Sequence, residues 1–272
     1  MKMLHDKIAI VTGAGRGIGA ATAKLLAAHG ALVVAGDLDA TPVEETAAAI
    51  AAIGGRAVAI PGDVTDPAYA ERLVAAALEL GGLDVLVANA GYTWDAMSHK
   101  MTDEQWDAML AVHLTAPFRL VRAAAPFIRE TAKAEQARDG RARPRKLIFV
   151  SSTSGTRGNL GQANYAAAKA GVVGLAKTIA KEWGAFNVQA NTVAFGFIDT
   201  RLTAPKEQGE HTERGGRPIA LGIPAQMREM SKLLIPLGRP GTPEEAAGPI
   251  LFLASPLADY VSGQVLEVTG GM

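Results

Sequence analysis

The sequence contains no cysteine, few aromatic residues and no excess of charge of either sign. Without cysteine the chain has no disulfide, no catalytic thiolate and no cysteine-based zinc site. Its five histidines are scattered without metal-ligand spacing, so we expect no metal. Basic and acidic residues balance at 27 each, for a formal net charge of +0. We therefore expect no general attraction to nucleic acid or to an anionic membrane.

Long hydrophobic runs are also missing. No apolar stretch approaches the length of a membrane span. The opening residues Met1–Lys7 lack the apolar segment of a signal peptide. These absences predict a cytoplasmic protein with no membrane partner.

Short apolar strands alternate with alanine-rich helical stretches through most of the 272 residues. This alternation predicts an α/β fold with a doubly wound, parallel, seven-stranded sheet in a single domain, residues 1–272. The expected strands are Lys7–Val11, Leu32–Gly36, Ala57–Ile60, Val85–Ala88, Leu147–Val150, Val188–Val193 and Gln264–Val268. The expected helices include Ala20–Ala28, Pro42–Ile53, Ala68–Leu80, Asp103–Arg129, Tyr165–Trp183 and Pro243–Leu253. Ligands of such sheets bind at the carboxyl ends of the strands.

Two segments depart from the alternation. Thr131–Lys146 is charged, and we expect a long solvated loop there, with binding of an acidic carrier or a phosphate as the alternative. Its basic residues are Arg138, Arg141, Arg143 and Arg145. Thr200–Leu234 is rich in proline and glycine and follows the sixth strand. Its position predicts a substrate lid over the ligand edge.

A glycine-rich turn opens the chain. The run Thr12-Gly13-Ala14-Gly15-Arg16-Gly17-Ile18-Gly19 lies between the first expected strand and the first expected helix. In this context the glycines let the backbone approach a pyrophosphate, and the helix N-terminus supplies N–H donors and partial positive charge. The turn therefore predicts a dinucleotide site. The alternative is a glycine-rich turn that binds nothing.

A tyrosine and a lysine are spaced by one helical turn later in the chain. Tyr165 and Lys169 lie on one helix face, and Ser152 ends an earlier strand where it can lie opposite them. A nearby ammonium favours the phenolate, so we expect Lys169 to lower the pKa of Tyr165 from about 10. Such a tyrosine can exchange a proton with a carbonyl or an alcohol. The alternative is a pair on the helix surface.

Together these motifs resemble the short-chain dehydrogenase/reductase family over nearly the whole length, Lys7 to Met272. The resemblance also rests on Gly62-Asp63-Val64, Asn89-Ala90-Gly91 and the segment Ser262–Gly271. Within the family, the run Gly158–Gly171 is most similar to 3-oxoacyl-acyl-carrier-protein reductases and to hydroxyacyl-CoA dehydrogenase domains. The resemblance implies a Rossmann fold, a nicotinamide cofactor and a homotetramer in which the apolar segment Leu251–Val268 packs against another subunit.

The resemblance also implies residue roles. Tyr165 is expected as general acid/base, Lys169 as its partner and a ligand of the nicotinamide ribose, and Ser152 as the residue that polarises the substrate oxygen. The implied cofactor-binding residues are Gly13, Gly15, Arg16, Gly17, Ile18, Gly19, Asp37, Asp63, Val64, Asn89, Ala90, Gly91, Tyr165, Lys169, Ile198 and Thr200.

Two positions depart from the family pattern. His113 stands where the family usually has an asparagine that supports a proton relay. A histidine there either keeps the relay and titrates near pH 7, or only packs. Phe195 replaces the usual proline before Gly196, which predicts a less fixed local turn beside Ile198 and Thr200.

Asp37 favours NAD(H) over NADP(H). It lies 24 residues after Gly13, where a carboxylate can hydrogen-bond the ribose 2′-hydroxyl and would repel a 2′-phosphate. Arg16 argues for NADP(H), because its side chain can reach a phosphate. We give Asp37 more weight, since like-charge repulsion in a partly desolvated site is costly.

The leading functional hypothesis is hydride transfer between NAD(H) and a 3-oxoacyl or 3-hydroxyacyl thioester. The alternative within enzymes is a dehydrogenase of another secondary alcohol, a sugar or a steroid, because loops and not the fold decide the substrate. A nicotinamide-binding regulator without turnover is disfavoured, because Tyr165 and Lys169 are both present.

Overall fold

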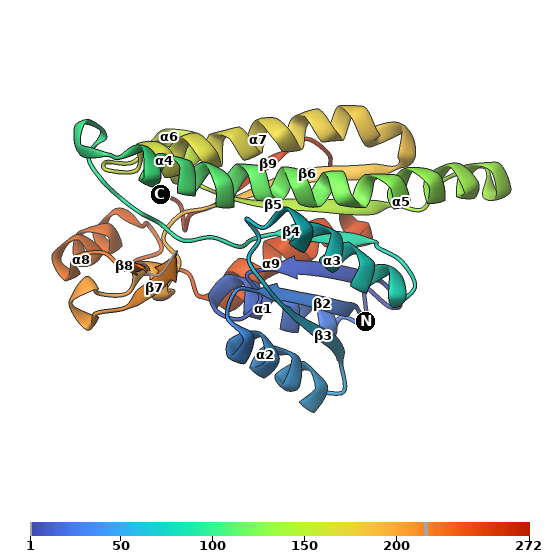
Figure 1. Cartoon of the computed structure of the whole chain (residues 1–272), viewed down its shortest axis with the longest axis horizontal. Helices are drawn as coiled ribbons and strands as arrows, with labels where there is room; N and C mark the ends of the chain where they lie inside the picture. Colours follow the sequence, from blue (N-terminus) through green and yellow to red (C-terminus); the bar gives the residue numbers. More distant parts are fainter. Residues whose placement is uncertain (1, 215–216) are drawn as a thin grey trace.

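The computed structural model describes residues 2–214 and 217–272 (Figure 1). Met1, Gly215 and Gly216, which fall within the expected domain and lid, lie outside the described residues. No helix in this described part is both long and apolar enough to cross a bilayer.

A seven-stranded parallel sheet forms the centre of the molecule, as the sequence predicted. Its strand order is β3-β2-β1-β4-β5-β6-β9. The strands are β1 (Ile8–Thr12), β2 (Leu32–Asp37), β3 (Arg56–Pro61), β4 (Val85–Ala88), β5 (Arg145–Ser152), β6 (Val188–Phe195) and β9 (Val265–Val268). The strand order reverses between β1 and β4, and ligands of doubly wound sheets bind at such a switch point.

Helices cover both faces of the sheet (Figure 1). One apolar core joins the sheet to α1, α2 and α9, and the other joins it to α3, α5 and α7. The α-helices are α1 (Gly17–Ala28), α2 (Ala40–Ala52), α3 (Pro67–Glu79), α4 (Asp103–Leu110), α5 (Ala116–Asp139), α6 (Thr153–Arg157), α7 (Ala163–Trp183), α8 (Ala225–Leu234) and α9 (Pro243–Ala254). The short 3-10 helices are η1 (Ser98–Lys100), η3 (Gly184–Phe186), η4 (Arg201–Thr203), η5 (Lys206–Gln208) and η6 (Pro256–Ala258). The central strands are apolar on both sides because each side meets a helical layer.

A π-helical turn interrupts the helix that the sequence predicted as continuous over Asp103–Arg129. This turn, η2 (Ala111–Thr115), separates α4 from α5. Pro117 follows it, and its nitrogen has no hydrogen to donate to the His113 carbonyl four residues earlier. The wider turn carries His113 into the protein interior, and π-turns of this kind are frequent at functional sites.

The expected solvated loop at Thr131–Lys146 is wrong. Helix α5 continues to Asp139, and β5 already begins at Arg145. Glu135 and Arg145 are both buried and form a two-pronged ion pair, with Nη1 and Nη2 each 3.0 Å from a carboxylate oxygen. The charges that suggested a loop are therefore partners across a helix–strand junction.

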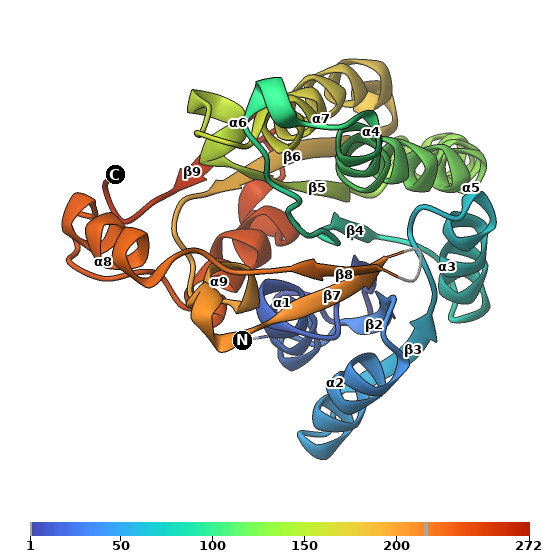
Figure 2. The same cartoon turned by 60° about the vertical axis from the view of Figure 1, so that its left-hand side comes forward.

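The segment Thr200–Leu234 is not an irregular loop but has secondary structure of its own. It contains an antiparallel hairpin of β7 (His211–Arg214) and β8 (Arg217–Ala220), followed by α8. Figure 1 shows the hairpin and α8 beside the sheet, outside its helical layers, and Figure 2 turns this side of the molecule toward the viewer. Buried Ile219 and Leu221 attach the hairpin to a small apolar cluster.

Candidate active site

A cavity of about 660 Å³ lies at the carboxyl edge of the sheet, below the segment Thr200–Leu234. This volume is within the usual range for ligand pockets. It brings together every predicted site residue except Gly15: Gly13, Arg16, Gly17, Ile18, Gly19, Asp37, Asp63, Val64, Asn89, Ala90, Gly91, His113, Ser152, Tyr165, Lys169, Ile198 and Thr200 all line it.

The glycine turn is packed too tightly for side chains at two of its glycines. A Cβ atom at Gly19 would lie 1.9 Å from the carbonyl oxygen of Gly13, and Gly13 itself has a φ of +68°. The Asn89 amide donates to the carbonyl oxygens of Thr12 (2.9 Å) and Gly13 (3.2 Å). These contacts hold the turn against the N-terminus of α1, where backbone N–H groups face the cavity edge. The residues present therefore fit a pyrophosphate.

Gly15 does not line the cavity but helps to position Asp37, which does. Its backbone N–H donates to Asp37 Oδ2 at 2.8 Å, and Asp37 Oδ1 accepts the N–H of Asp39 at 3.1 Å. These two hydrogen bonds fix the carboxylate at the end of β2, facing the cavity. Arg16 is exposed at the same rim.

Ser152, Tyr165 and Lys169 converge from two elements. Ser152 ends β5 and its hydroxyl caps the next turn by accepting the Ser154 N–H at 3.1 Å. Tyr165 and Lys169 occupy successive turns of α7, with Lys169 Nζ 5.5 Å from the centre of the Tyr165 ring. Lys169 is buried, and its Nζ donates to the carbonyl oxygen of Val150 at 2.6 Å.

The pKa of Tyr165 is not lowered as the sequence suggested. Burial raises the pKa of Tyr165 to about 12, and the Ser152 hydrogen bond only partly opposes this. Burial also lowers the pKa of Lys169 to about 7. The expectation failed because surrounding protein atoms disfavour both charged forms, and Lys169 faces a neutral carbonyl rather than an anion.

His113, which is part of the π-turn η2, lies beside Tyr165 of α7. The two rings meet edge to face with centroids 4.9 Å apart, and His113 Nε2 contacts the Tyr92 carbonyl oxygen at 2.7 Å, so Nε2–H is the donor. Its Nδ1 is buried without a hydrogen-bond partner. Burial, with the Lys169 charge, holds the pKa of His113 well below its usual value of 6.5. The expected titration near pH 7 is therefore wrong, and the ring is neutral at that pH.

The turn after β6 is well fixed despite Phe195. That side chain is buried, and β6 runs to it rather than ending at Val193. Gly241 then exchanges backbone hydrogen bonds on both sides, accepting from Asp199 at 2.8 Å and donating to Phe197 at 3.0 Å. This pairing replaces the rigidity of a proline and places Ile198 and Thr200 at the cavity.

The basic residues of Thr131–Lys146 do not belong to this site. They lie around the start of β5, whereas Ser152 ends it, so the strand separates them by roughly 20 Å. Arg138, Arg143 and Arg145 are paired with Asp139 or Glu135. The structure thus gives no support to an acidic carrier docking through these arginines next to the cavity.

Three residues of the site were missed in the sequence. The Thr12 hydroxyl accepts the backbone N–H groups of Asn89 (3.0 Å) and Ala90 (3.1 Å), which ties β1 to the end of β4. Asp95 and Gln162 hydrogen-bond each other on the cavity wall. Thr12 and Gln162 stand inside the motifs, but their partners are 67 or more residues away, so spacing alone gave no signal.

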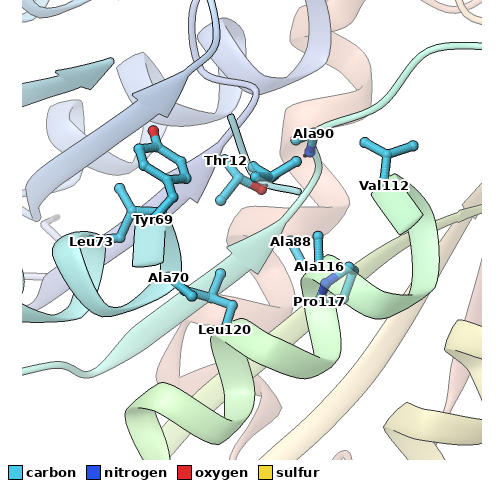
Figure 3. Close-up of a pocket in the computed structure, with 11 residues that line it drawn as sticks. Thr12, Tyr69, Ala70, Leu73, Ala88, Ala90, Val112, Ala116, Pro117 and Leu120 are labelled. Carbon is cyan, nitrogen blue, oxygen red and sulfur yellow. Dashed lines mark hydrogen bonds between the residues drawn. The ribbon is translucent and has the colours of Figure 1, made fainter. Parts of the chain in front are cut away.

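A second cavity lies behind the first, between α3, β4 and the start of α5. Figure 3 shows its lining, in which Ala90 and Val112 also border the large cavity. Its volume is about 20 Å³, which is room for one water molecule. It is therefore too small for a substrate. Within residues 2–214 and 217–272, no group of three His, Asp or Glu side chains is placed to hold a metal.

Comparison with known proteins agrees with this geometry. The family model described as short chain dehydrogenase matches residues 7–211. A 3-oxoacyl-[acyl-carrier-protein] reductase FabG of Thermotoga maritima is 38% identical over 270 residues, which cover 99% of this chain and 98% of that protein. The FabG of Vibrio cholerae is 39% identical, with 99% and 98% covered. The hydroxyacyl-CoA dehydrogenase ChsB1 of Mycobacterium tuberculosis is 41% identical, with 98% and 78% covered.

Proposed function

Since the chain belongs to the short-chain dehydrogenase family, we propose that it transfers a hydride between NAD(H) and a 3-oxoacyl or 3-hydroxyacyl thioester. As a member of this family it is an NAD(P)-dependent oxidoreductase that acts on CH–OH groups. The observation that carries the thioester is the full-length similarity to reductases and a dehydrogenase whose names specify acyl thioesters, together with Ser152, Tyr165 and Lys169 at one cavity.

The chain's own residues account for the proton. In reduction, Ser152 and Tyr165 hydrogen-bond the substrate carbonyl oxygen, and the Tyr165 hydroxyl donates its proton to that oxygen as the carbonyl carbon receives the hydride. A pKa of about 12 keeps Tyr165 protonated at neutral pH, which suits an acid. Lys169, which a pKa of about 7 leaves partly protonated at neutral pH, then stabilises as an ammonium the phenolate that forms. In oxidation the same proton returns to Tyr165.

The cofactor would be held by the residues that the sequence indicated. Gly13, Gly17 and the N-terminus of α1 fit the pyrophosphate, Asp37 the adenosine ribose, and Asp63 with Val64 the adenine. Asn89, Ala90 and Gly91 would line the ribose side, and Lys169, Ile198 and Thr200 the nicotinamide side. The bound nicotinamide supplies the hydride in reduction and accepts it in oxidation.

We favour NAD(H) because the Asp37 carboxylate is held in place by the Gly15 N–H at 2.8 Å and cannot easily turn away from a 2′-phosphate. Activity at equal concentrations of NADH and NADPH tests this choice. NADH should be preferred, and Asp37→Ser should reduce the preference at least tenfold (roughly 1.4 kcal/mol). An initial preference for NADPH would show that Arg16 decides the cofactor instead.

Part of the segment Thr200–Leu234 lines the cavity, and this position suits a lid. Met227 and Leu234 of α8 line the cavity, although both are largely exposed. We propose that the segment Thr200–Leu234 covers the substrate and completes the site. Apolar side chains there suit an acyl chain.

A panel of carbonyl compounds tests the substrate class. With NADH, acetoacetyl-CoA should be reduced with a higher kcat/KM than steroid ketones, sugars or simple ketones. Greater activity with one of those three would favour the alternative, a dehydrogenase of another secondary alcohol. Binding of NADH without turnover of any compound would favour a regulator.

We further infer a homotetramer in the cytoplasm. Leu257 and Tyr260, in the segment that leads into the edge strand β9, are 71% and 104% exposed, and Phe252 of α9 is partly exposed. Apolar surface of this kind at a sheet edge supports contact with another subunit. The cytoplasmic location is supported by the composition and by similarity to FabG proteins.

A further inference from the structure

The cavity wall beside Tyr165 carries a network of side-chain hydrogen bonds that the proposed reaction does not use. Gln162, the residue before α7, is its centre. Its Oε1 accepts from Ser154 Oγ (2.8 Å) and Asn159 Nδ2 (2.9 Å), and its Nε2 donates to Asp95 Oδ2 (3.0 Å). Because a carboxylate only accepts and a hydroxyl can donate, the network fixes which end of the amide faces which neighbour.

Backbone contacts hold both sides of this network together. Ala96 donates its N–H to the Gly161 carbonyl oxygen at 2.9 Å and pairs with Gln162 as a parallel bridge. Asn164 is fully buried and donates to the Trp94 carbonyl oxygen at 3.1 Å. The loop that carries Asp95 is thus attached to the first turn of α7, and the amide is preorganised before a ligand arrives.

Charge supports the same orientation. Burial raises the pKa of Asp95 overall, and the Gln162 hydrogen bond and the positive charge of Lys206 on the lid partly oppose this rise. The other titratable groups near Tyr165 are Lys169 and His113, which lie on α7 and η2. Neither forms a hydrogen bond with Gln162, so Asp95 is the charged residue that orients its amide.

The Gln162 amide nitrogen carries two hydrogens, and Asp95 accepts one of them. We propose that the second donates to the thioester carbonyl oxygen, so that Gln162 is a specificity-determining residue and Asp95 a positioning residue that acts through it. Gln162 and Tyr165 lie three residues apart at the start of α7, and both line the cavity. In a 3-oxoacyl thioester, one methylene carbon separates the 3-oxo group from the thioester carbonyl. When the 3-oxo oxygen contacts Tyr165, the thioester carbonyl therefore lies one methylene carbon further along the substrate. The inference rests on the proposed function, because it places the thioester at Tyr165.

Two substrates that differ by one oxygen test the proposal. One is the acetoacetyl thioester of N-acetylcysteamine, and the other is the ketone in which a methylene replaces the thioester carbonyl. Wild type should reduce the thioester with at least about tenfold higher kcat/KM. Gln162→Leu should bring the ratio of kcat/KM for thioester to that for ketone close to one. It should change kcat/KM for the ketone less than about threefold. The loss should appear mainly in KM, because the hydrogen bond is made equally before and during the reaction.

Two further variants separate this role from a structural one. Asp95→Asn should lower the ratio as well, because an asparagine can donate and no longer fixes the Gln162 amide. Gln136→Leu is the matched control: Gln136 is exposed near the end of α5 and bonds only the Ala185 carbonyl oxygen, so the ratio should stay unchanged. NADH affinity should be the same in all four proteins.

The outcomes are distinct. Equal kcat/KM for thioester and ketone in wild type would overturn the role of Gln162 and leave the proposed function standing. An unchanged ratio in Gln162→Leu, or equal losses for both substrates, would also overturn it. No turnover of the thioester by NADH-bound wild type would overturn the proposed function and this inference with it.

Discussion

At the scale of single residues, the site is built from groups whose charged forms are disfavoured. Lys169 is 4% exposed, and among the described residues its ammonium contacts a neutral carbonyl oxygen, that of Val150, and the Tyr165 ring rather than an anion. His113 is 3% exposed with a free Nδ1. Stability alone would not select such groups, so their burial beside Tyr165 indicates a functional site.

The pH dependence of stability should reveal the buried lysine. The pKa of Lys169 is about 7 in the folded protein and near 10.5 in the unfolded chain, so between these values the unfolded chain binds more protons. The stability of wild type relative to Lys169→Met should therefore rise by a few kcal/mol from about pH 7 to pH 10.5. Chemical denaturation of both proteins over this range measures it. A constant difference would mean that Lys169 is not perturbed.

His113 should cause a pH dependence of stability with the same sign, but at lower pH. Its pKa lies well below 6.5 when folded, so stability is fully present above pH 6.5 and is lost as pH falls below it. His113→Asn should lose less stability than wild type between pH 6.5 and 5, as measured by thermal or urea unfolding. Identical acid sensitivity of the two proteins would contradict a buried, neutral His113.

Gly91 leaves the space that His113 occupies. A Cβ at this position would lie 2.1 Å from His113 Cε1, so Gly91→Ala must displace the ring and its hydrogen bond to Tyr92. We expect a loss of about 1–3 kcal/mol in the free energy of unfolding. In a His113→Ala background the same change should cost much less. Additive losses in a double-mutant cycle would contradict direct contact.

At the scale of elements, the sequence predicted what hydrophobic patterning controls. Strands such as Val85–Ala88 and helices such as α9 match because their apolar residues face the core. The end of α5 was missed because buried Glu135 and Arg145 look like solvated charges in a sequence. The π-turn was missed because Pro117 is tolerated in the first turn of α5 and marks no break by itself.

The junction of α5 and β5 gives a test of that correction. Arg145→Met should destabilise the protein by about 3–5 kcal/mol, because it removes both guanidinium hydrogen bonds of the buried Glu135 carboxylate and leaves it only the backbone N–H and the more distant guanidinium of Arg143. Replacing both residues, as Glu135→Leu with Arg145→Met, should be less damaging than Arg145→Met alone. A solvated loop, by contrast, would make both variants nearly neutral in urea unfolding.

At the scale of the whole molecule, parallel strands bring distant motifs to one edge. This rule predicted a ligand at the carboxyl ends of the strands, and Gly13, Asp37, Asn89 and Ser152, which the family resemblance implied, line one cavity there. It did not predict the Asp95–Gln162 contact or the hairpin β7–β8, because loop geometry depends on packing that leaves no period in the sequence. The fold and the main site residues could therefore be predicted from the sequence, whereas the arrangement of the substrate-facing walls could not.

Assembly is the property of the whole molecule that is easiest to test. Light scattering after gel filtration should give a mass near four times 28.2 kDa. The double variant Leu257→Ser with Tyr260→Ser should shift the protein to smaller species, because both are large apolar or aromatic side chains that are exposed in the single chain. A monomeric wild-type protein would contradict the homotetramer.

The proposed reaction is tested most directly by oxidation of NADH with acetoacetyl-CoA in wild type and in Tyr165→Phe. We predict turnover in wild type and a loss of about a hundredfold or more in the variant, with NADH binding retained, because only the proton donor is removed. Turnover that persists in Tyr165→Phe would contradict the assigned acid, and absence of turnover in NADH-bound wild type would contradict the thioester substrate.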